Sequence, residues 1–250
     1  MFVHSREEVR RALTLAAAGQ NACQISREIG VPGRTISNWL RNGPPGSSPR
    51  YPDVPIEGIT DGKGSAYAYL LGLYLGDGCV SRMPRTYCLR ITLDCAYPGI
   101  IDAAAATIDE LIPSGRAGKY PRKVSNCCDV VSYSRSWPRL LPQHGPGRKH
   151  LRDVSLVAWQ TAITSANPAA LIRGLIHSDG CRFTANQRVR GRMYSYARYC
   201  FVNESTDILR IFCDHLDLLG ISWTQQRRDA IQIARREAVA RLDEFVGPKK

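Results

Sequence analysis

The sequence predicts an α+β fold in which a small all-α unit precedes two αββαββα repeats. Three observations carry this prediction. A nine-residue motif occurs twice, and its aspartates Asp77 and Asp179 lie 102 positions apart. Each motif is followed by alternating apolar and polar residues and then by a helical pattern. Residues 42–64 hold five Pro and five Gly, a composition that interrupts helices. We therefore expect a helix-turn-helix domain, a linker and two repeats, with the bounds 1–41, 42–64, 65–150 and 151–250.

The composition indicates a globular chain with a polyanionic partner. The chain has 250 residues, 44% of them hydrophobic, enough to bury a sizeable core. Its 34 Lys and Arg outnumber 22 Asp and Glu, and the net charge of +12 favours nucleic acid as the partner. No apolar run reaches the ~18 residues of a membrane span, and residues 1–8 do not read as a signal peptide. We expect an intracellular protein without membrane contact, cytoplasmic and associated with the nucleoid.

The nine cysteines do not predict disulfides or a zinc site. Their number is odd and they include no Cys-x-x-Cys pair. Cys213 and His215 have no partner pair at zinc-ligand spacing. We expect most of the cysteines to be small buried hydrophobic residues.

The first 41 residues show three helical patterns. An apolar stripe that includes Val9 and Leu13 stops at Gly19, and a second pattern covers residues 23–29. Gly30 then permits a sharp turn before a third pattern, which places Ile36, Trp39 and Leu40 inward. This part resembles the helix-turn-helix modules of bacterial regulators, with residues 25–31 as the matching segment. The second helix of such a pair enters the major groove, and its expected DNA contacts are Arg34, Thr35, Ser37, Asn38 and Arg41. An ordinary helical hairpin with a solvated polar face is the alternative.

Both repeats show the same order of expected elements. The first has its motif helix through residue 77, a strand over 87–93, a helix over 100–111 and two strands within 115–133. The second has its motif helix through residue 179, a long hairpin over 181–203, a helix that begins after Ser205, strands over 223–227 and 231–233, and a last helix over 237–246.

The motif residues predict two closely packed helices that end in an acidic pair. Gly72 and Gly76 in one copy, and Gly174 and Ser178 in the other, are small residues four positions apart on one helix face. Such faces let two helix backbones approach as a central seam. Gly78 and Gly180 then end the helices. This leaves Asp77 and Asp179 at the negative ends of two helix dipoles. Two converging carboxylates repel each other unless a cation stands between them, and oxygen ligands favour Mg²⁺.

The paired motifs resemble those of the LAGLIDADG homing endonucleases in their single-chain, two-repeat form. The resemblance covers about residues 66–247. It implies a pseudo-twofold axis along the motif helices, two saddle-shaped antiparallel sheets over double-stranded DNA, and a monomer, because both repeats are in one chain. It further implies that Asp77 and Asp179 bind the metal that activates water, with help from the main-chain carbonyls of Gly76 and Ser178.

The sequence departs from the family pattern at one motif position. The sixth residue, often acidic in the family, is Leu75 in one copy and His177 in the other. We interpret His177 as a partly buried helix histidine, with a polar supporting role at the site as the alternative. Family members also use a lysine near the attacking water. The best match is Lys149, and Lys119 and Lys123 compete with it.

Basic and amide side chains on the expected hairpins would read DNA in a saddle of this kind. Arginine pairs with guanine and glutamine with adenine in the major groove. The expected contacts are Arg82, Arg85, Arg90, Arg182, Gln187, Arg188, Arg190, Arg192, Arg227 and Arg228.

Taken together, these features predict a Mg²⁺-dependent, site-specific DNA endonuclease that cuts both strands. The alternative is a non-cleaving transcriptional regulator that uses the LAGLIDADG fold as a DNA clamp, as the helix-turn-helix unit would suggest. An RNA-binding maturase would show a similar charge.

Overall fold

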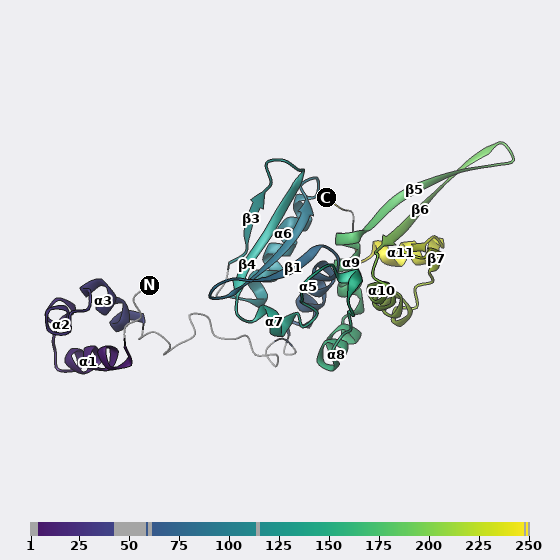
Figure 1. Ribbon diagram of the computed structural model, residues 1–250. Helices are drawn as coiled ribbons and strands as arrows, with labels where there is room; N and C mark the ends of the chain where they lie inside the picture. Colours follow the sequence, from purple (N-terminus) through teal and green to yellow (C-terminus); the bar gives the residue numbers. More distant parts are fainter. Residues whose placement is uncertain (1–4, 43–58, 60–61, 114–115, 248, 250) are drawn as a thin grey trace. The chain divides into compact units, whose positions relative to one another are not determined.

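The computed structural model describes residues 5–42, 59, 62–113, 116–247 and 249, and these divide into two compact units (Figure 1). The first unit spans residues 1–52 and the second, the body, spans residues 53–250. None of the described helices has the length and apolar character needed to cross a bilayer.

In the N-terminal unit, helices α1 (Arg6–Ala17), α2 (Ala22–Ile29) and α3 (Gly33–Asn42) surround a small core. Capping boxes start α1 at Ser5 and α2 at Asn21, and Gly30 ends α2 with a left-handed φ of 71°. Two predictions are wrong here. Leu13 and Leu40 are 37% and 41% exposed. The buried positions are Ala12, Ile25, Val31, Ile36 and Trp39.

Most of the predicted linker, residues 42–64, lies outside the described residues. Its two ends differ from the prediction. Asn42 is the last residue of α3. Ile59 is fully buried in the core of the body, so the body begins before the predicted residue 65.

The two repeats of the body have the predicted order of elements and the same sheet topology. The first repeat comprises α5 (Gly64–Asp77), β1 (Gly78–Arg82), β2 (Tyr87–Asp94), α6 (Pro98–Leu111), β3 (Gly118–Pro121), β4 (Cys127–Ser134) and α7 (Trp137–Leu140). The second comprises α9 (Pro168–Asp179), β5 (Gly180–Val189), β6 (Arg192–Val202), α10 (Thr206–Leu218), β7 (Thr224–Arg227), β8 (Ala230–Ile233) and α11 (Arg236–Asp243). Both sheets are antiparallel, with orders β1-β2-β4-β3 and β5-β6-β8-β7, which confirms the predicted fold class.

Two short elements between the repeats were not predicted. They are the 3₁₀ turn η1 (Lys149–Leu151) and helix α8 (Ala158–Ala166). In α8, Gln160 is completely buried, and its amide nitrogen donates to the hydroxyl of Tyr67 at 2.6 Å. This contact ties the connection between the repeats to α5.

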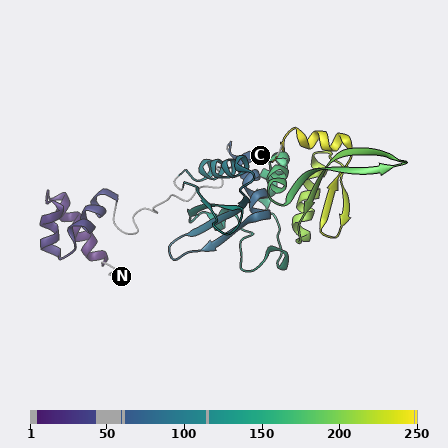
Figure 2. The same ribbon diagram turned by 90° about the horizontal axis from the view of Figure 1, so that it is seen from above.

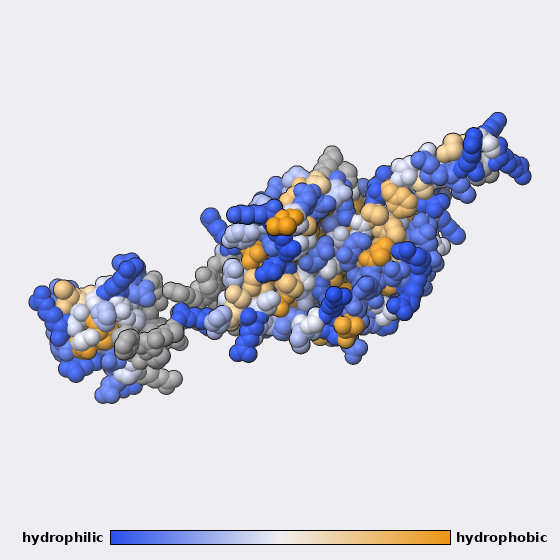
Figure 3. Space-filling model, turned by 45° about the horizontal axis from the view of Figure 1, so that its top comes forward, coloured by the Kyte–Doolittle hydropathy of each residue, from blue (hydrophilic) through white to orange (hydrophobic). Residues whose placement is uncertain are grey.

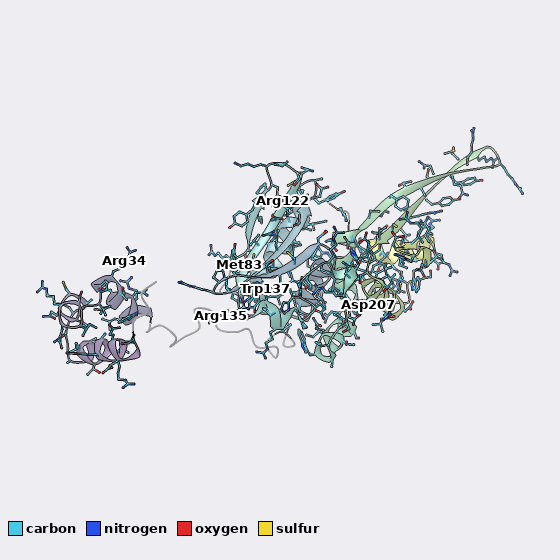
Figure 4. All side chains as sticks on the ribbon, in the orientation of Figure 1. Arg34, Met83, Arg122, Arg135, Trp137 and Asp207 are labelled. Atoms are coloured by element: carbon cyan, nitrogen blue, oxygen red, sulfur yellow. The ribbon has the colours of Figure 1, made fainter. Side chains whose placement is uncertain are left out.

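One hydrophobic core runs through both repeats, with the motif helices at its centre (Figures 1 and 2). Residues 67–75 of α5 are all buried, as expected for a helix that is apolar on every side. The strands bury alternate residues, as with Leu89, Ile91 and Leu93 of β2. Trp137, which lies inside the first repeat in Figure 4, is fully buried and donates from Nε1 to the carbonyl of Ser132 at 3.1 Å.

Candidate active site

The seam between α5 and α9 is formed by small residues, as predicted. A side chain at Gly72 would place its Cβ 2.5 Å from the carbonyl oxygen of Leu171 and 2.7 Å from the amide nitrogen of Leu175. A Cβ at Gly174 would clash with the carbonyl oxygen of Tyr69 and approach the Cα of Gly72 to 3.0 Å. Backbone therefore meets backbone along the seam, and no larger side chain fits between the helices.

Both motif helices end at their aspartates because glycine follows. Gly78 and Gly180 have extended backbones, with φ of −92° and −99°, and begin β1 and β5 directly. A Cβ at Gly78 would lie 2.5 Å from the Cα of Tyr74, and one at Gly180 would lie 2.7 Å from the Cα of Ile176. The glycines thus permit a close approach of the backbone at the exit from each helix, rather than the left-handed cap that usually calls for glycine at this position.

Asp77 and Asp179 meet at the same end of the seam, beside Gly76 and Ser178. A Cβ at Gly76 would clash with the side chain of Ser178 and lie 3.0 Å from Oδ2 of Asp179. Burial, and then the charge of Asp179, raise the pKa of Asp77 to about 6. Burial also raises the pKa of Asp179, although a hydrogen bond from Nδ2 of Asn203 to its Oδ2, at 2.6 Å, opposes this shift. The two carboxylates therefore form one electrostatically coupled pair.

Of the three lysines considered from the sequence, only Lys149 reaches this pair. Its Nζ donates to the last carbonyls of α5, those of Tyr74, Leu75 and Gly76, at 2.5, 3.0 and 2.8 Å. Burial lowers the pKa of Lys149 to about 8, while the two aspartates act in the opposite direction. The ammonium group lies at the negative end of the helix dipole, where a cation is stabilised.

Lys119 and Lys123 lie elsewhere. Lys119 is on β3 and forms an ion pair with Asp102 of α6 at 2.6 Å. Lys123 is exposed in the turn between β3 and β4.

A second lysine, which the sequence analysis missed, has the same relation to the other motif helix. Nζ of Lys249 donates to the carbonyls of Gly180 and Ser178 at 2.5 and 3.5 Å. It also lies 5.6 Å from the centroid of the Tyr97 ring. Burial lowers its pKa, and Asp77 and Asp179 act in the opposite direction. No motif surrounds Lys249, so only its spacing of 100 residues from Lys149, close to the repeat spacing, could have indicated it.

The end of the seam at Asp179 opens into a hollow that both repeats line. Gly76, Lys149, Asp179 and Asn203 contribute to its wall. His150 and Glu204 lie at the same hollow, with Nδ1 of His150 2.8 Å from Oε2 of Glu204. The hollow therefore brings the carboxylate of Asp179 and the ammonium group of Lys149 next to each other.

The outer face of each sheet is the face opposite the helices. In β2 the buried residues Leu89 and Ile91 alternate with Arg90, which is exposed on that outer face. In β6 the buried Tyr199 and Phe201 place Arg198 on the outer face. Nη1 of Arg198 donates to Gln232 at 3.4 Å. The sequence analysis missed Arg198 because the face of a strand depends on a register that the hairpin pattern alone does not settle.

Arg182 does not lie with the other predicted DNA contacts. It pairs with Tyr199 in the sheet register and forms two hydrogen bonds with Asp243 of α11 at 2.8 and 2.9 Å. Its side chain is therefore directed to the helix side of the sheet. Arg182 therefore does not belong to the outer face of its sheet.

The other predicted arginines and Gln187 are exposed, most of them at hairpin ends. Arg82 and Arg85 flank the β1–β2 turn, and Arg227 and Arg228 lie at the β7–β8 turn. Gln187, Arg188 and Arg192 lie near the tip of the β5–β6 hairpin, whose turn residues Arg190 and Gly191 have φ of 49° and 80°. Figure 3 shows a mainly hydrophilic surface on this projecting hairpin.

In the N-terminal unit, the polar residues predicted for DNA contact share one surface. Arg34, Thr35, Ser37, Asn38 and Arg41 line a shallow hollow on α3 together with Pro32. Arg34 projects from the surface of this unit in Figure 4.

The cysteines are all free, but their burial differs from the prediction. Cys88, Cys128 and Cys213 are buried, whereas Cys23, Cys79 and Cys181 are exposed. Cys79 and Cys181 follow the motif glycines into the first strand, on the outer face of each sheet, and this position exposes them. Within the described residues, no group of three or more His, Cys, Asp or Glu side chains could hold a metal ion.

No protein-family model and no curated protein matches the chain. Among solved structures, it is similar to the homing endonuclease I-DmoI in complex with DNA and Mn, at 18% identity over 74% of this chain and 97% of that one, with a TM-score of 0.46. It is also similar to the LAGLIDADG meganuclease I-AabMI bound to uncleaved DNA (11% identity, 72% and 82% coverage, TM-score 0.46). A third similar structure is the meganuclease I-SmaMI bound to uncleavable DNA (7% identity, 73% and 84% coverage, TM-score 0.47).

Two repeats with one sheet topology meet along a glycine seam that ends in an acidic pair. These features are the ones that the resemblance to the two-repeat LAGLIDADG homing endonucleases implies for the body of the chain.

Proposed function

We propose that the body is a divalent-metal-dependent, site-specific endonuclease that hydrolyses a phosphodiester bond in each strand of double-stranded DNA. The observation that carries the proposal is the pair of half-buried, coupled carboxylates of Asp77 and Asp179, flanked by Lys149 and Lys249. Burying two repelling carboxylates at a helix junction destabilises a fold unless the site binds a cation.

The residues present fit a hard divalent cation. Carboxylate and carbonyl oxygens are the ligands that Mg²⁺ and Mn²⁺ prefer. Burial, and then the charge of Asp179, raise the pKa of Asp77, and a cation between the two groups would offset the second of these effects. Asp77 and Asp179 would hold the ion, with the carbonyls of Gly76 and Ser178 as further oxygen donors. When bound, such an ion neutralises charge on the phosphate and lowers the pKa of a coordinated water.

The two lysines would stabilise charge on the DNA. With its pKa lowered to about 8, the side chain of Lys149 is still mainly cationic at neutral pH. It stands beside the acids, where a phosphate would enter, and would stabilise the negative charge that grows during hydrolysis. Lys249 would do the same at the end of α9. Asn203 would keep the Asp179 carboxylate ionised and oriented through its hydrogen bond.

The outer faces of the sheets would hold the DNA. Arg90 and Arg198 are placed there by strand register, and the exposed hairpin residues extend this surface. The net charge of +12 would strengthen binding through phosphate contacts. Since one chain supplies both acids and both sheets, a monomer completes the site.

Cleavage of plasmid DNA tests the proposal. A target is first selected from a plasmid library with a randomised insert, by recovering molecules that the protein linearises in Mg²⁺ or Mn²⁺. We expect linear product at one site with metal and none in EDTA. Asp77→Asn and Asp179→Asn should each lower the cleavage rate by roughly a thousandfold or more while DNA affinity changes by less than about tenfold.

Asp214→Asn is the matched control, because Asp214 is exposed on α10, away from the seam. It should leave cleavage unchanged. Cleavage near the wild-type rate by either seam variant would show that the metal assignment is wrong.

A DNA-binding role for the N-terminal unit is the second candidate function, and the α3 hollow lined by the predicted DNA-contacting residues supports it. A regulator that clamps DNA without cutting would depend on this unit for its sequence preference. In the full-length chain, Arg34→Ala with Arg41→Ala should reduce the slope of log affinity against log salt by about 2, since each arginine would neutralise one phosphate. An unchanged slope and affinity, measured on the selected site, would show that α3 does not read DNA.

A further inference from the structure

His177 is a buried polar group that joins three parts of the body. It occupies the sixth motif position of α9, where α5 has Leu75. Only 6% of the residue is exposed. Its Nδ1 lies 2.9 Å from the hydroxyl of Tyr69 on α5, and its Nε2 lies 3.0 Å from the carbonyl oxygen of Val246, after α11. Leu75, the equivalent residue of the first repeat, shows that an apolar side chain can occupy this position. The two polar contacts of His177 are therefore the feature that distinguishes the second repeat.

The two contacts select one form of the ring. The carbonyl of Val246 can only accept, so Nε2 carries the proton and donates. The Tyr69 hydroxyl then donates to Nδ1, and its ring meets the imidazole edge-on, with centroids 5.6 Å apart and an interplanar angle of 89°. With Nε2 donating and Nδ1 accepting, one neutral form of the ring makes both bonds.

The segment that His177 holds is the one that carries Lys249. Helix α11 ends at Asp243, and the amide nitrogen of Val246 still donates to the carbonyl of Leu242 at 2.9 Å. The carbonyl of Val246 instead accepts from His177. Three residues later, Nζ of Lys249 reaches the carbonyl of Gly180, at the end of the helix to which His177 belongs. Three residues span at most about 10 Å, so fixing Val246 limits where Lys249 can lie.

The first repeat holds its lysine in another way. Lys149 begins the turn η1, in which the amide nitrogens of Leu151 and Arg152 donate to the carbonyls of Arg148 and Lys149. Those local bonds set the backbone of Lys149 directly. The equivalent of His177 in that repeat, Leu75, is apolar and cannot make such bonds.

We propose that His177 is a positioning residue, which fixes the segment after α11 so that the ammonium of Lys249 stays at the end of α9. Tyr69 contributes by orienting the imidazole. The inference that this placement serves DNA cleavage rests on the proposed function, whereas the placement itself does not.

The first test measures the placement without metal or DNA. The full-length protein is treated with a small amine-acylating reagent, and tandem mass spectrometry follows the modification of Lys249 and Lys149 over time. In His177→Leu, which copies the first repeat, we expect Lys249 to react about fivefold faster, the factor that corresponds to the removal of one hydrogen bond. Lys149 should react at its wild-type rate and is the internal control. Tyr69→Phe should give a smaller increase at Lys249, and His177→Gln, which keeps a donor, should restore most of the protection.

The second test measures the consequence for cleavage. On a selected target with each strand labelled separately, His177→Leu should slow one strand about fivefold and leave the other unchanged, so that nicked DNA accumulates. A residue with a merely structural role would, when replaced, slow both strands together.

The outcomes separate the two proposals. Equal acylation of Lys249 in wild type and His177→Leu, or faster acylation of both lysines, would overturn the positioning role. If His177→Leu does not fold, His177→Met gives the same comparison with an unbranched apolar side chain. If the wild-type protein cuts no selected DNA with any divalent metal, the proposed function fails, and the acylation rates still decide the role of His177.

Discussion

The two repeats share the same order of strands and helices, but they surround their acidic residues differently. Both have four-stranded sheets of the same order and motif helices that end in Asp-Gly. In the second repeat, however, Asn203 donates a hydrogen bond to Asp179, and the lysine near this acid, Lys249, lies beyond α11. Around Asp77 the lysine belongs to the turn that follows the repeat. Backbone symmetry therefore preserves the positions of the acids, while the polar groups around each acid differ between the two halves.

The same contrast holds for the hairpins. The β1–β2 hairpin has strands of five and eight residues, whereas β5 and β6 have ten and eleven. The longer hairpin extends well past the rest of its sheet in Figure 1. An asymmetric pair of hairpins suits a DNA target without a twofold axis, since each half would contact a different length of groove.

The largest expected effect tests what the repeats share. Gly72→Leu and Gly174→Leu should each lower the free energy of unfolding by roughly 3 kcal/mol or more, the upper end for overpacked cores, because the added side chain meets backbone atoms of the partner helix. Urea denaturation measures this decrease. Ala106→Leu, at an exposed position of α6, should change stability by less than about 0.5 kcal/mol. If the two glycine variants differed strongly from each other, the seam would not be symmetric.

A smaller effect tests how the two acids differ. The pKa of Asp77 is raised from its ordinary value near 3.9 to about 6. The ionised carboxylate of Asp77 therefore lowers the free energy of unfolding by its full amount above pH 6. This destabilisation becomes smaller as the pH falls towards 4. Asp77→Asn should raise the free energy of unfolding by up to about 3 kcal/mol at pH 7.5 in EDTA and by almost nothing at pH 3.5.

Asp179→Asn should give a smaller gain, because the hydrogen bond from Asn203 already stabilises the Asp179 carboxylate. Adding Mg²⁺ should stabilise the wild-type protein and not the Asp77→Asn variant. Equal gains at both pH values, in urea titrations of either variant, would contradict the raised pKa of the acid that was replaced.

The smallest effect separates the two faces of the sheets. Arg90→Ala should lower the slope of log DNA affinity against log salt by about 1, because Arg90 is exposed on the outer face of its sheet. Arg182→Ala should leave that slope unchanged and instead cost about 1 kcal/mol of stability, since Arg182 bonds Asp243 at a partly exposed position. Fluorescence anisotropy at several salt concentrations measures the slopes. A reduced slope for Arg182→Ala alone would reverse our assignment of the faces.

Much of the fold of the body could be predicted because the motif, and the pattern of residues that follows it, occur twice in the sequence. The repeated spacing of small residues predicts the seam, and the aspartate before each glycine marks the end of each motif helix. The alternation through Leu89 and Ile91 predicts which side of β2 is buried. These features depend on local periodicity, which is visible in one sequence.

Features that depend on distant contacts could not be predicted. Arg182 looks like its neighbours on the hairpin, and only the position of α11 shows that Asp243 engages it. Lys249 reaches the site because α11 ends at Asp243, three residues before the predicted end at Val246. The prediction that Leu13 and Leu40 point inward is wrong because Ala12 and Trp39 already fill a small three-helix core.

The glycine contact between α5 and α9 has a consequence for the shape of the proposed reaction product. Backbone atoms in contact cannot slide or separate without disrupting the core. The packing of α5 against α9 therefore keeps Asp77 and Asp179 at a constant spacing. For an enzyme that cuts both strands, that spacing determines the offset between the two breaks. The length of the single-stranded ends of the product would then depend on how α5 packs against α9. Substitutions on the sheet faces would change which DNA is cut and leave the length of the overhang as it is.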